Sequence, residues 1–304
     1  PIIPFSPVIH YYQFIMKFKL EGAWALVVCA LLWSTGGILI KFIQASSFFI
    51  AGFRSLIALF VFMIVLKRLP VFFVKDENGT TDKKRTLYLW LAATSYSATM
   101  ILFCIANKLT TAANTILLQY TNPVYIILFS PILLGEKNSK WDYVTALGVL
   151  CGIILFFAGD IDAGNLLGNI LAALSGLTFG FTTIYMRKQR THGSENSFMI
   201  AHLITAIVGI PLGFMNGGAV QGGDFGSWAA LLAIGIFQMA FATILYSRGI
   251  GKVTALSSGI ITMIEPLMNP VWVMIFAHEI PSVTCIFGGV IILGCILIRE
   301  VSTK

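Results

Sequence analysis

The sequence predicts an all-α membrane protein, with ten transmembrane helices arranged as two inverted five-helix repeats. The chain is 57% hydrophobic and only 11% charged over 304 residues, whereas soluble domains average about 25% charged residues. Its apolar stretches are long and continuous, unlike the alternating strands of a membrane barrel. Its second half also resembles its first. So much apolar surface cannot be hidden in a water-soluble core.

Polar turns divide the chain into ten apolar stretches, each near the roughly 20 residues that a helix needs to cross a bilayer. The expected spans are about 22–41, 47–67, 86–105, 110–134, 142–159, 166–186, 197–216, 227–247, 253–277 and 282–299. We therefore expect an N-terminal tail over 1–21, a first repeat over 22–159 and a second over 166–299. Met16 opens a plausible natural start, so Pro1–Ile15 is expected to be upstream sequence.

The internal repeat is clearest between segments 109–136 and 252–279, which align without a gap. The matched pairs are Thr111 with Thr254, Ala112 with Ala255, Pro123 with Pro266, and Glu136 with Glu279. Because five spans is an odd number, the second half must enter the membrane from the opposite side. Inverted repeats of this kind typically build a solute site near the bilayer midplane.

Charge placement predicts the orientation. With the N-terminus in the cytoplasm, all of the 20 Lys and Arg residues except Lys41, Lys108 and Arg54 fall on the cytoplasmic side. Such asymmetry is the usual determinant of topology. We expect a multi-pass protein of the cytoplasmic membrane with both termini inside. We therefore interpret the net charge of +7 as orienting the chain in the membrane, and not as a binding surface for nucleic acid.

Motifs for catalysis, metals and cofactors are absent from the sequence. There is no P-loop, no HExxH and no Cys/His zinc spacing, and the cysteines fall singly within apolar spans as small buried residues. These are Cys29, Cys104, Cys151, Cys285 and Cys295. We expect no enzyme activity, no cofactor and no metal.

Ionisable residues at membrane depth are costly and are candidates for function. Glu265 lies near mid-span, between Thr262 and Asn269, where Pro266 and Pro270 disturb the helix. It either binds a cationic group, carries a coupling proton, or forms a static ion pair.

Arg54 and His202 are the other two ionisable residues in the spans. Arg54 is expected to have a structural role, either paired with Glu265 or extended to the interface. His202 is isolated in an apolar run. Both remain candidates for ion coupling.

Polar and aromatic side chains near mid-span complete the expected binding site. A midplane cavity for a small polar solute could use aromatic rings and amide groups. The expected substrate-binding residues are Trp33, Tyr96, Asn114, Gln119, Tyr120, Gln238, Glu265 and Asn269. Tyr and Trp also anchor helices at interfaces, and Asn also joins helices by hydrogen bonds.

Four segments resemble the EamA branch of the drug/metabolite transporter superfamily. They are Leu31–Gly36 with Lys41, Arg54, Pro123 with 133–136, and Glu265–Val273 with Glu279. The resemblance covers about residues 21–299. It implies the ten-helix fold, a cavity walled by the first, third, fourth, sixth, eighth and ninth helices, and peripheral fifth and tenth helices.

Two functional classes follow. The first is a secondary active transporter that moves a small-molecule metabolite, such as an amino acid or an amine, by alternating access, with or without protons. The second is a passive facilitator or channel for small solutes. Membrane lipid surrounds either one, and both a monomer and a homodimer stay open.

Overall fold

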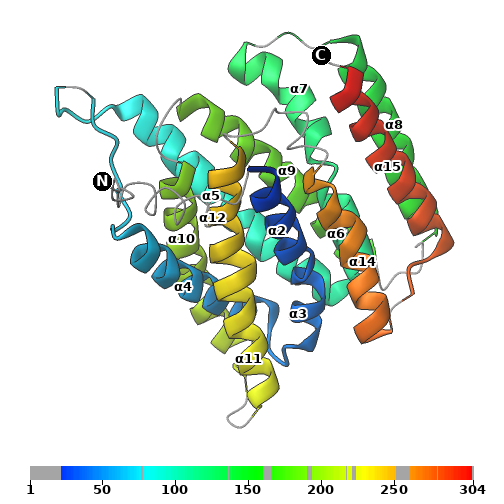
Figure 1. Ribbon diagram of the computed structural model, residues 1–304, viewed down its shortest axis with the longest axis horizontal. Coiled ribbons are helices and arrows are strands. Elements are labelled where there is room, and N and C mark those ends of the chain that lie inside the picture. The colour runs from blue at the N-terminus through cyan, green and yellow to red at the C-terminus, as the bar shows by residue number, and fades with distance from the viewer. Residues whose placement is uncertain are drawn as a thin grey trace, which may run out of the picture.

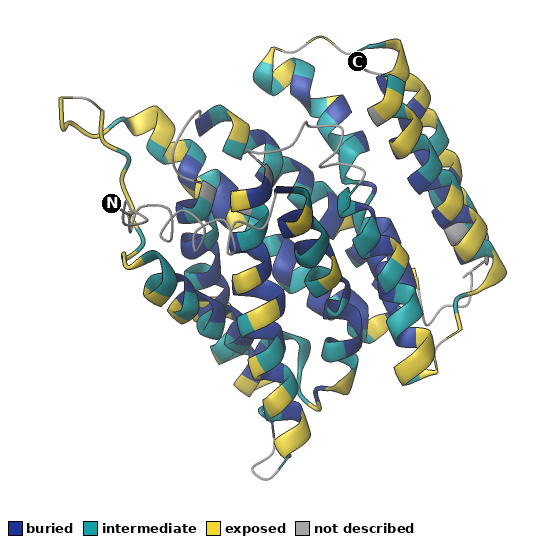
Figure 2. Cartoon of the chain, in the orientation of Figure 1, coloured by how far each residue is buried: buried dark blue, intermediate teal, exposed yellow. Residues whose placement is uncertain are grey.

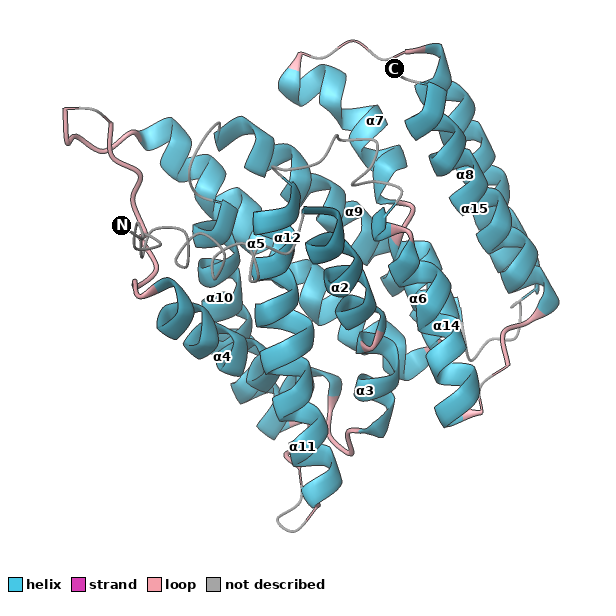
Figure 3. Ribbon diagram, in the orientation of Figure 1, coloured by secondary structure: helices cyan, strands magenta, loops and turns pink. Residues whose placement is uncertain are grey.

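The computed structural model describes residues 22–76, 78–135, 137, 139–159, 166–189, 194–216, 218–220, 224–250, 261–278 and 280–302. Within these ranges the protein is a bundle of helices without a strand, apart from one isolated bridge between Lys75 and Thr81 (Figure 3). The predicted all-helical class is confirmed. The predicted tail over 1–21 lies outside the described residues, as do Glu136 and Glu279.

The helices follow one another in the order shown in Figure 1. They are α2 (Gly22–Ser34), α3 (Gly36–Phe42), α4 (Ser47–Leu66), α5 (Lys83–Leu109), α6 (Ala112–Gln119), α7 (Asn122–Leu134), α8 (Lys140–Gly159), α9 (Leu166–Gln189), α10 (Ser194–Met215), α11 (Phe225–Ala233), the π-helix η1 (Ile234–Phe241), α12 (Ala242–Ile250), α14 (Ile264–Ala277) and α15 (Val283–Ser302).

Seven stretches of helix in the described part are long and apolar enough to cross a membrane. They are Gly22–Phe42, Ser47–Leu66, Lys83–Leu109, Ala112–Leu134, Leu166–Gln189, Glu195–Met215 and Phe225–Tyr246, and two shorter apolar helices cover Ile264–Ala277 and Val283–Arg299. Large apolar side chains such as Leu147, Ile154, Phe287 and Val290 are exposed on the bundle surface (Figure 2). An apolar exterior is what a lipid solvent requires.

Three helix pairs dominate the packing: α5 with α9, α4 with α10, and α8 with α15. The α8–α15 pair stands at one edge of the bundle (Figure 1), in the peripheral position expected for the segments 142–159 and 282–299. Glycines bring α4 and α10 together, since a Cβ on Gly209 would lie 2.8 Å from the backbone nitrogen of Gly52.

Two spans that the sequence predicts as continuous are interrupted. The span 22–41 breaks at Thr35, and the span 110–134 breaks between Gln119 and Asn122. Hydroxyl groups bond to carbonyls at these breaks: Thr35 Oγ1 donates to Leu32 O at 2.7 Å and Thr121 Oγ1 to Leu118 O at 2.6 Å. Broken helices are tolerated at membrane depth when such groups are satisfied within the protein.

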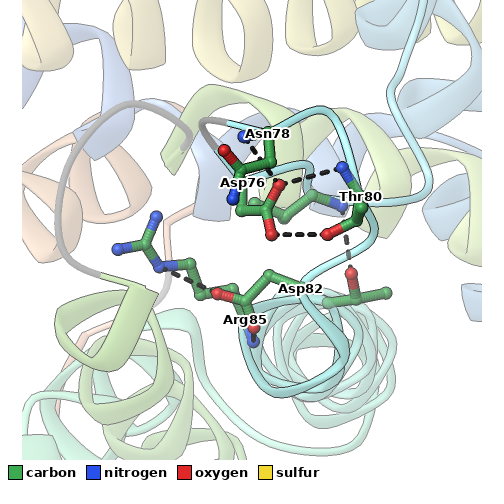
Figure 4. A network of polar contacts seen from close by, with 7 residues as sticks. Asp76, Asn78, Thr80, Asp82 and Arg85 are labelled. Atoms are coloured by element: carbon green, nitrogen blue, oxygen red, sulfur yellow. Dashed lines mark hydrogen bonds and ion pairs between the residues drawn. The ribbon is translucent and has the colours of Figure 1, made fainter.

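The connection between α4 and α5 ends in a compact polar turn around Asp76 (Figure 4). Asp76 accepts hydrogen bonds from Asn78 N at 3.0 Å, Thr80 N at 2.9 Å and the Thr80 hydroxyl at 2.5 Å. The hydroxyl bond chiefly lowers the pKa of Asp76, because it stabilises the charged carboxylate. Asp82 caps α5 by accepting from Arg85 N at 3.0 Å, so the helix begins at Lys83, three residues before the predicted start.

Candidate functional site

Helix irregularities from both halves of the chain meet in the middle of the bundle. The α2–α3 break packs against α14 and η1, and the α6–α7 break contacts α14 through α6. Gln238 of η1 donates from Nε2 to Trp33 O at 3.5 Å, one residue before the end of α2. π-helical segments such as η1 are rare and often mark functional sites. The polar groups of this region come from η1 and from the helix ends at the two breaks.

Glu265 and Tyr120 form the centre of this region. The Tyr120 hydroxyl contacts Glu265 Oε2 at 2.8 Å and Thr262 O at 3.1 Å. Glu265 lies in the first turn of α14, where the positive end of the helix dipole favours a carboxylate. Both side chains are half-buried. The contact joins two residues that the sequence predicts in the binding site from opposite halves.

Several aromatic side chains lie in the region of Glu265. Trp33 of α2 packs on Tyr246 of α12, with ring centroids 5.2 Å apart and planes tilted by 38°. Tyr96 and Cys29 lie within electrostatic reach of Glu265. An acid beside several aromatic faces is chemically suited to a cationic or aromatic small molecule.

The two glycines after the α2 break allow amide side chains to approach the backbone. A Cβ on Gly36 would lie 2.8 Å from Gln238 Nε2, and one on Gly37 would lie 2.5 Å from Asn269 Oδ1. Asn269 is fully buried, and neither of its amide atoms has a hydrogen-bond partner among the described residues. The predicted residues Gln238 and Asn269 therefore lie against two adjacent glycines, Gly36 and Gly37.

Asn114 is held in a different place from the other predicted residues. Its Nδ2 donates to Asn169 Oδ1 at 3.2 Å and lies 3.4 Å from Thr110 Oγ1, in the packed contact between α6 and α9. Interhelical amide bonds of this kind join membrane helices. Gln119 is half-buried, and its backbone oxygen would lie 2.8 Å from a Cβ on Gly176 of α9.

Arg54 and Glu265 do not form the ion pair that the sequence left open. Arg54 Nη2 donates to Met100 O at 3.1 Å, while the Glu265 carboxylate is bonded to Tyr120. Arg54 is 1% exposed, so its guanidinium does not reach the interface either. The physical reason is helix placement: α4 packs against α10, α5 and η1, whereas α14 packs against α2, α3 and α6.

His202 lies with Arg54 in the core formed by α4, α5 and α10. Its ring is fully buried, 5.7 Å from the Phe62 ring and 6.2 Å from the Tyr96 ring. Tyr96 is also in contact with the rings of Phe179 and Phe198. It lies at the junction between this core and the Glu265 region, because it is within electrostatic reach of both Arg54 and Glu265.

Trp272 and Ser34 lie in the family-like motifs but were not among the residues predicted for the binding site. Trp272 Nε1 donates to Ser34 Oγ at 2.8 Å, which joins α14 to the end of α2. Helical spacing could have identified Trp272, because positions i, i+4 and i+7 share one helix face. Glu265, Asn269 and Trp272 have that spacing.

Comparisons with known proteins agree with this fold. A crystal structure that is 19% identical superposes with a TM-score of 0.60, covering 90% of this chain and 94% of that chain. An uncharacterized transporter of Archaeoglobus fulgidus is 27% identical, over 91% of this chain and 95% of its own length.

Two further relatives match a smaller part of the chain. The pseudopaline exporter CntI of Pseudomonas aeruginosa is 26% identical, over 62% of this chain and 66% of its own length. The solute carrier family 35 member G1 of Mus musculus is 24% identical, over 62% of this chain and 53% of its own length. The family model described as the EamA-like transporter family matches residues 20–158 and again residues 166–299. This multi-pass membrane protein belongs to the EamA-like transporter family.

Proposed function

We propose that the chain is a secondary active transporter that moves a small polar metabolite across the cytoplasmic membrane by alternating access. The observation that carries the proposal is the contact between Tyr120 and Glu265. It joins an acidic residue of the second half to a helix break of the first half, and discontinuous helices of this kind build the solute sites of many transporters. Transport rather than catalysis also agrees with the names of the relatives.

Glu265 is the proposed centre of the substrate site, with Trp33, Tyr96, Gln238 and Asn269 around it. Its carboxylate would bind either a cationic group of the substrate or a coupling proton. Tyr120 would orient it through the hydroxyl bond. Asn114 and Gln119 are proposed to act from the adjoining α6, by holding it against α9.

Two inverted five-helix repeats are the proposed architecture. Moving five spans along the chain exchanges α2 with α9, α4 with α10, α6 with α14, and α5 with the eighth span, which includes η1 and α12. Under that exchange, the contact of α5 with α9 corresponds to the contact of α12 with α2. Likewise, the contact of α10 with α5 corresponds to the contact of α4 with η1. All four contacts are present. The double match to one family model, over 20–158 and 166–299, gives independent support for repeats over 22–159 and 166–299.

Both termini are proposed to lie in the cytoplasm. Lys41 and Lys108, the two basic residues assigned to the outer side, meet at one end of the bundle. Lys41 Nζ donates to Thr110 O at 3.0 Å and Lys108 Nζ to Ile43 O at 2.7 Å. Reporter fusions at the C-terminus and in the 76–82 loop would both read as cytoplasmic, and an external reading at either position contradicts the ten-span topology.

The transport proposal is tested with purified protein in liposomes. A thermal-shift screen of amino acids, amines, nucleosides and sugars first identifies a ligand, because binding to the folded state raises its stability. Uptake of that ligand is then compared between the wild type, Glu265→Gln, Tyr120→Phe and the control Glu195→Gln, which removes a surface carboxylate. We expect Glu265→Gln to lose at least about ten-fold in uptake, which corresponds to about 1.4 kcal/mol.

Unchanged, still pH-sensitive uptake by Glu265→Gln would remove Glu265 from the proposed role. Counterflow separates a carrier from a facilitator that works as an open pore. Preloading the liposomes with unlabelled ligand should accelerate uptake by a carrier, whereas an open pore shows no such stimulation.

A further inference from the structure

A buried polar cluster between α4, α5 and α10 lies apart from the Glu265 region. Arg54 is 1% exposed, and only its Nη2 is bonded, to Met100 O. Its Nε and Nη1 have no acceptor among the described residues. Buried polar groups are almost always hydrogen-bonded, and a buried charge is normally paired. Two guanidinium nitrogens without an acceptor, which together carry three N–H groups, therefore indicate affinity for an acceptor within the bundle core.

The acids described at or within the helices are engaged elsewhere. Glu265 is bonded to Tyr120, Asp142 forms an ion pair with Arg299, and Glu195 forms an ion pair with Arg68. The charge of Arg54 is thus not met by a carboxylate in the part of the chain that the structure covers.

A second unbonded polar side chain, His202, lies in the same core. His202 is fully buried, lies within electrostatic reach of Arg54, and neither ring nitrogen has a partner in the described ranges. A neutral imidazole supplies one N–H donor. The nearby hydroxyls are already bonded: Thr205 Oγ1 donates to Ala201 O at 2.8 Å and lies 2.8 Å from Ser97 Oγ, which uses the Ser97 hydrogen.

We propose that Arg54 and His202 form a binding site for one small monovalent anion. The donor set carries one full positive charge and no carboxylate, so it suits an anion and repels a metal cation. A halide ion and the carboxylate of a small organic acid share the required chemistry. Because Tyr96 lies within electrostatic reach of both Arg54 and Glu265, an anion here would also change the field around the proposed transport site.

The test measures binding, so it does not depend on transport. Purified protein is melted in sodium chloride, sodium acetate and sodium gluconate at equal ionic strength. We expect a saturable rise of several degrees in the melting temperature of the wild type with chloride or acetate over gluconate. Arg54→Gln should lose that rise, while the surface control Arg68→Gln should keep it.

Chloride and acetate distinguish the two kinds of anion. A rise in melting temperature with chloride alone identifies a halide site, and a rise with acetate alone identifies a carboxylate site. Equal melting temperatures of the wild type in all three salts, or the same rise in Arg54→Gln, overturn the proposal.

If Arg54→Gln does not fold, two further measurements decide. Arg54→Lys keeps the charge but loses the planar fork of donors, so the anion should still stabilise it, with at least about ten-fold weaker affinity. Crystals grown in bromide should show an anomalous peak within hydrogen-bonding distance of Arg54. Unchanged affinity in Arg54→Lys would be incompatible with this site, as would bromide peaks only at the protein surface when chloride is the stabilising anion.

Discussion

Gly37 tests whether the half-helices at the centre are packed as the structure describes. A Cβ on this residue would lie 2.5 Å from Asn269 Oδ1 and 3.0 Å from Ala112 Cβ. Ordinary contacts begin at 3.4 Å, so the amide is about 0.9 Å too close. Ala112 Cβ is fixed to its backbone, and the fully buried Asn269 amide can withdraw only by leaving its packed position.

The expected cost of Gly37→Ala is about 1–3 kcal/mol, the usual range for overpacking a core. Gly294→Ala is the matched control, because a Cβ there meets no atom within 4 Å. Replacing a glycine within a helix without a clash stabilises it by about 0.5–1 kcal/mol. The two variants should thus differ by about 1.5–4 kcal/mol, or on the order of 2–6 °C in melting temperature.

The assay is thermal unfolding of purified protein in detergent, with each variant melted beside the wild type. Asn269→Ala should relieve part of the cost of Gly37→Ala, giving a coupling of at least about 1 kcal/mol between neighbouring sites. The reasoning is refuted if Gly37→Ala melts at the temperature of Gly294→Ala, because α3 and α14 would then not be in close contact at Gly37.

Two further predictions concern the ends of the bundle. Asp142→Asn should destabilise the α8–α15 pair by about 1–3 kcal/mol, because Arg299 Nε lies 2.5 Å from Asp142 Oδ1 and the Asp142 side chain is only 9% exposed; an unchanged melting temperature contradicts this. Asn196→Ala should destabilise more than Arg68→Ala, by about 1 kcal/mol or more. Asn196 accepts from Val71 N at 2.7 Å and also donates to Val71 O, whereas the exposed ion pair of Arg68 with Glu195 contributes about 0–1 kcal/mol. Equal melting temperatures of Asn196→Ala and Arg68→Ala would contradict this ranking of the two contacts.

Local patterns were sufficient for the helices and for several residues of the candidate site. Pro123 and Pro266 marked the helices whose ends meet near Glu265, and the aromatic and amide residues Trp33, Gln238 and Asn269 were identified by their depth in the spans. The breaks at Thr35 and Thr121 were missed, because an apolar stretch of the right length looks continuous when its few hydroxyls are counted as ordinary polar residues.

The pairing of charges could not be predicted. Arg54 and Glu265 were the obvious partners, because each is an isolated ionisable residue in an apolar span. Helical periodicity determines which residues share a face, but it does not determine which helix that face meets. The packing of α4 against α10 left Arg54 beside His202, while α14 was brought to Tyr120, 145 residues away in the sequence.

The sequence by itself determined that this chain is a helical membrane protein, because apolar length and few charges leave a bilayer as the only compatible solvent. It also determined the family, through motifs that are local in the chain. Only the tertiary structure decided that Glu265 bonds to Tyr120 and that Arg54 lies in a separate core. Those contacts depend on packing between distant helices, where the shapes of Gly37, Gly52 and Gly209 decide how closely two backbones can approach.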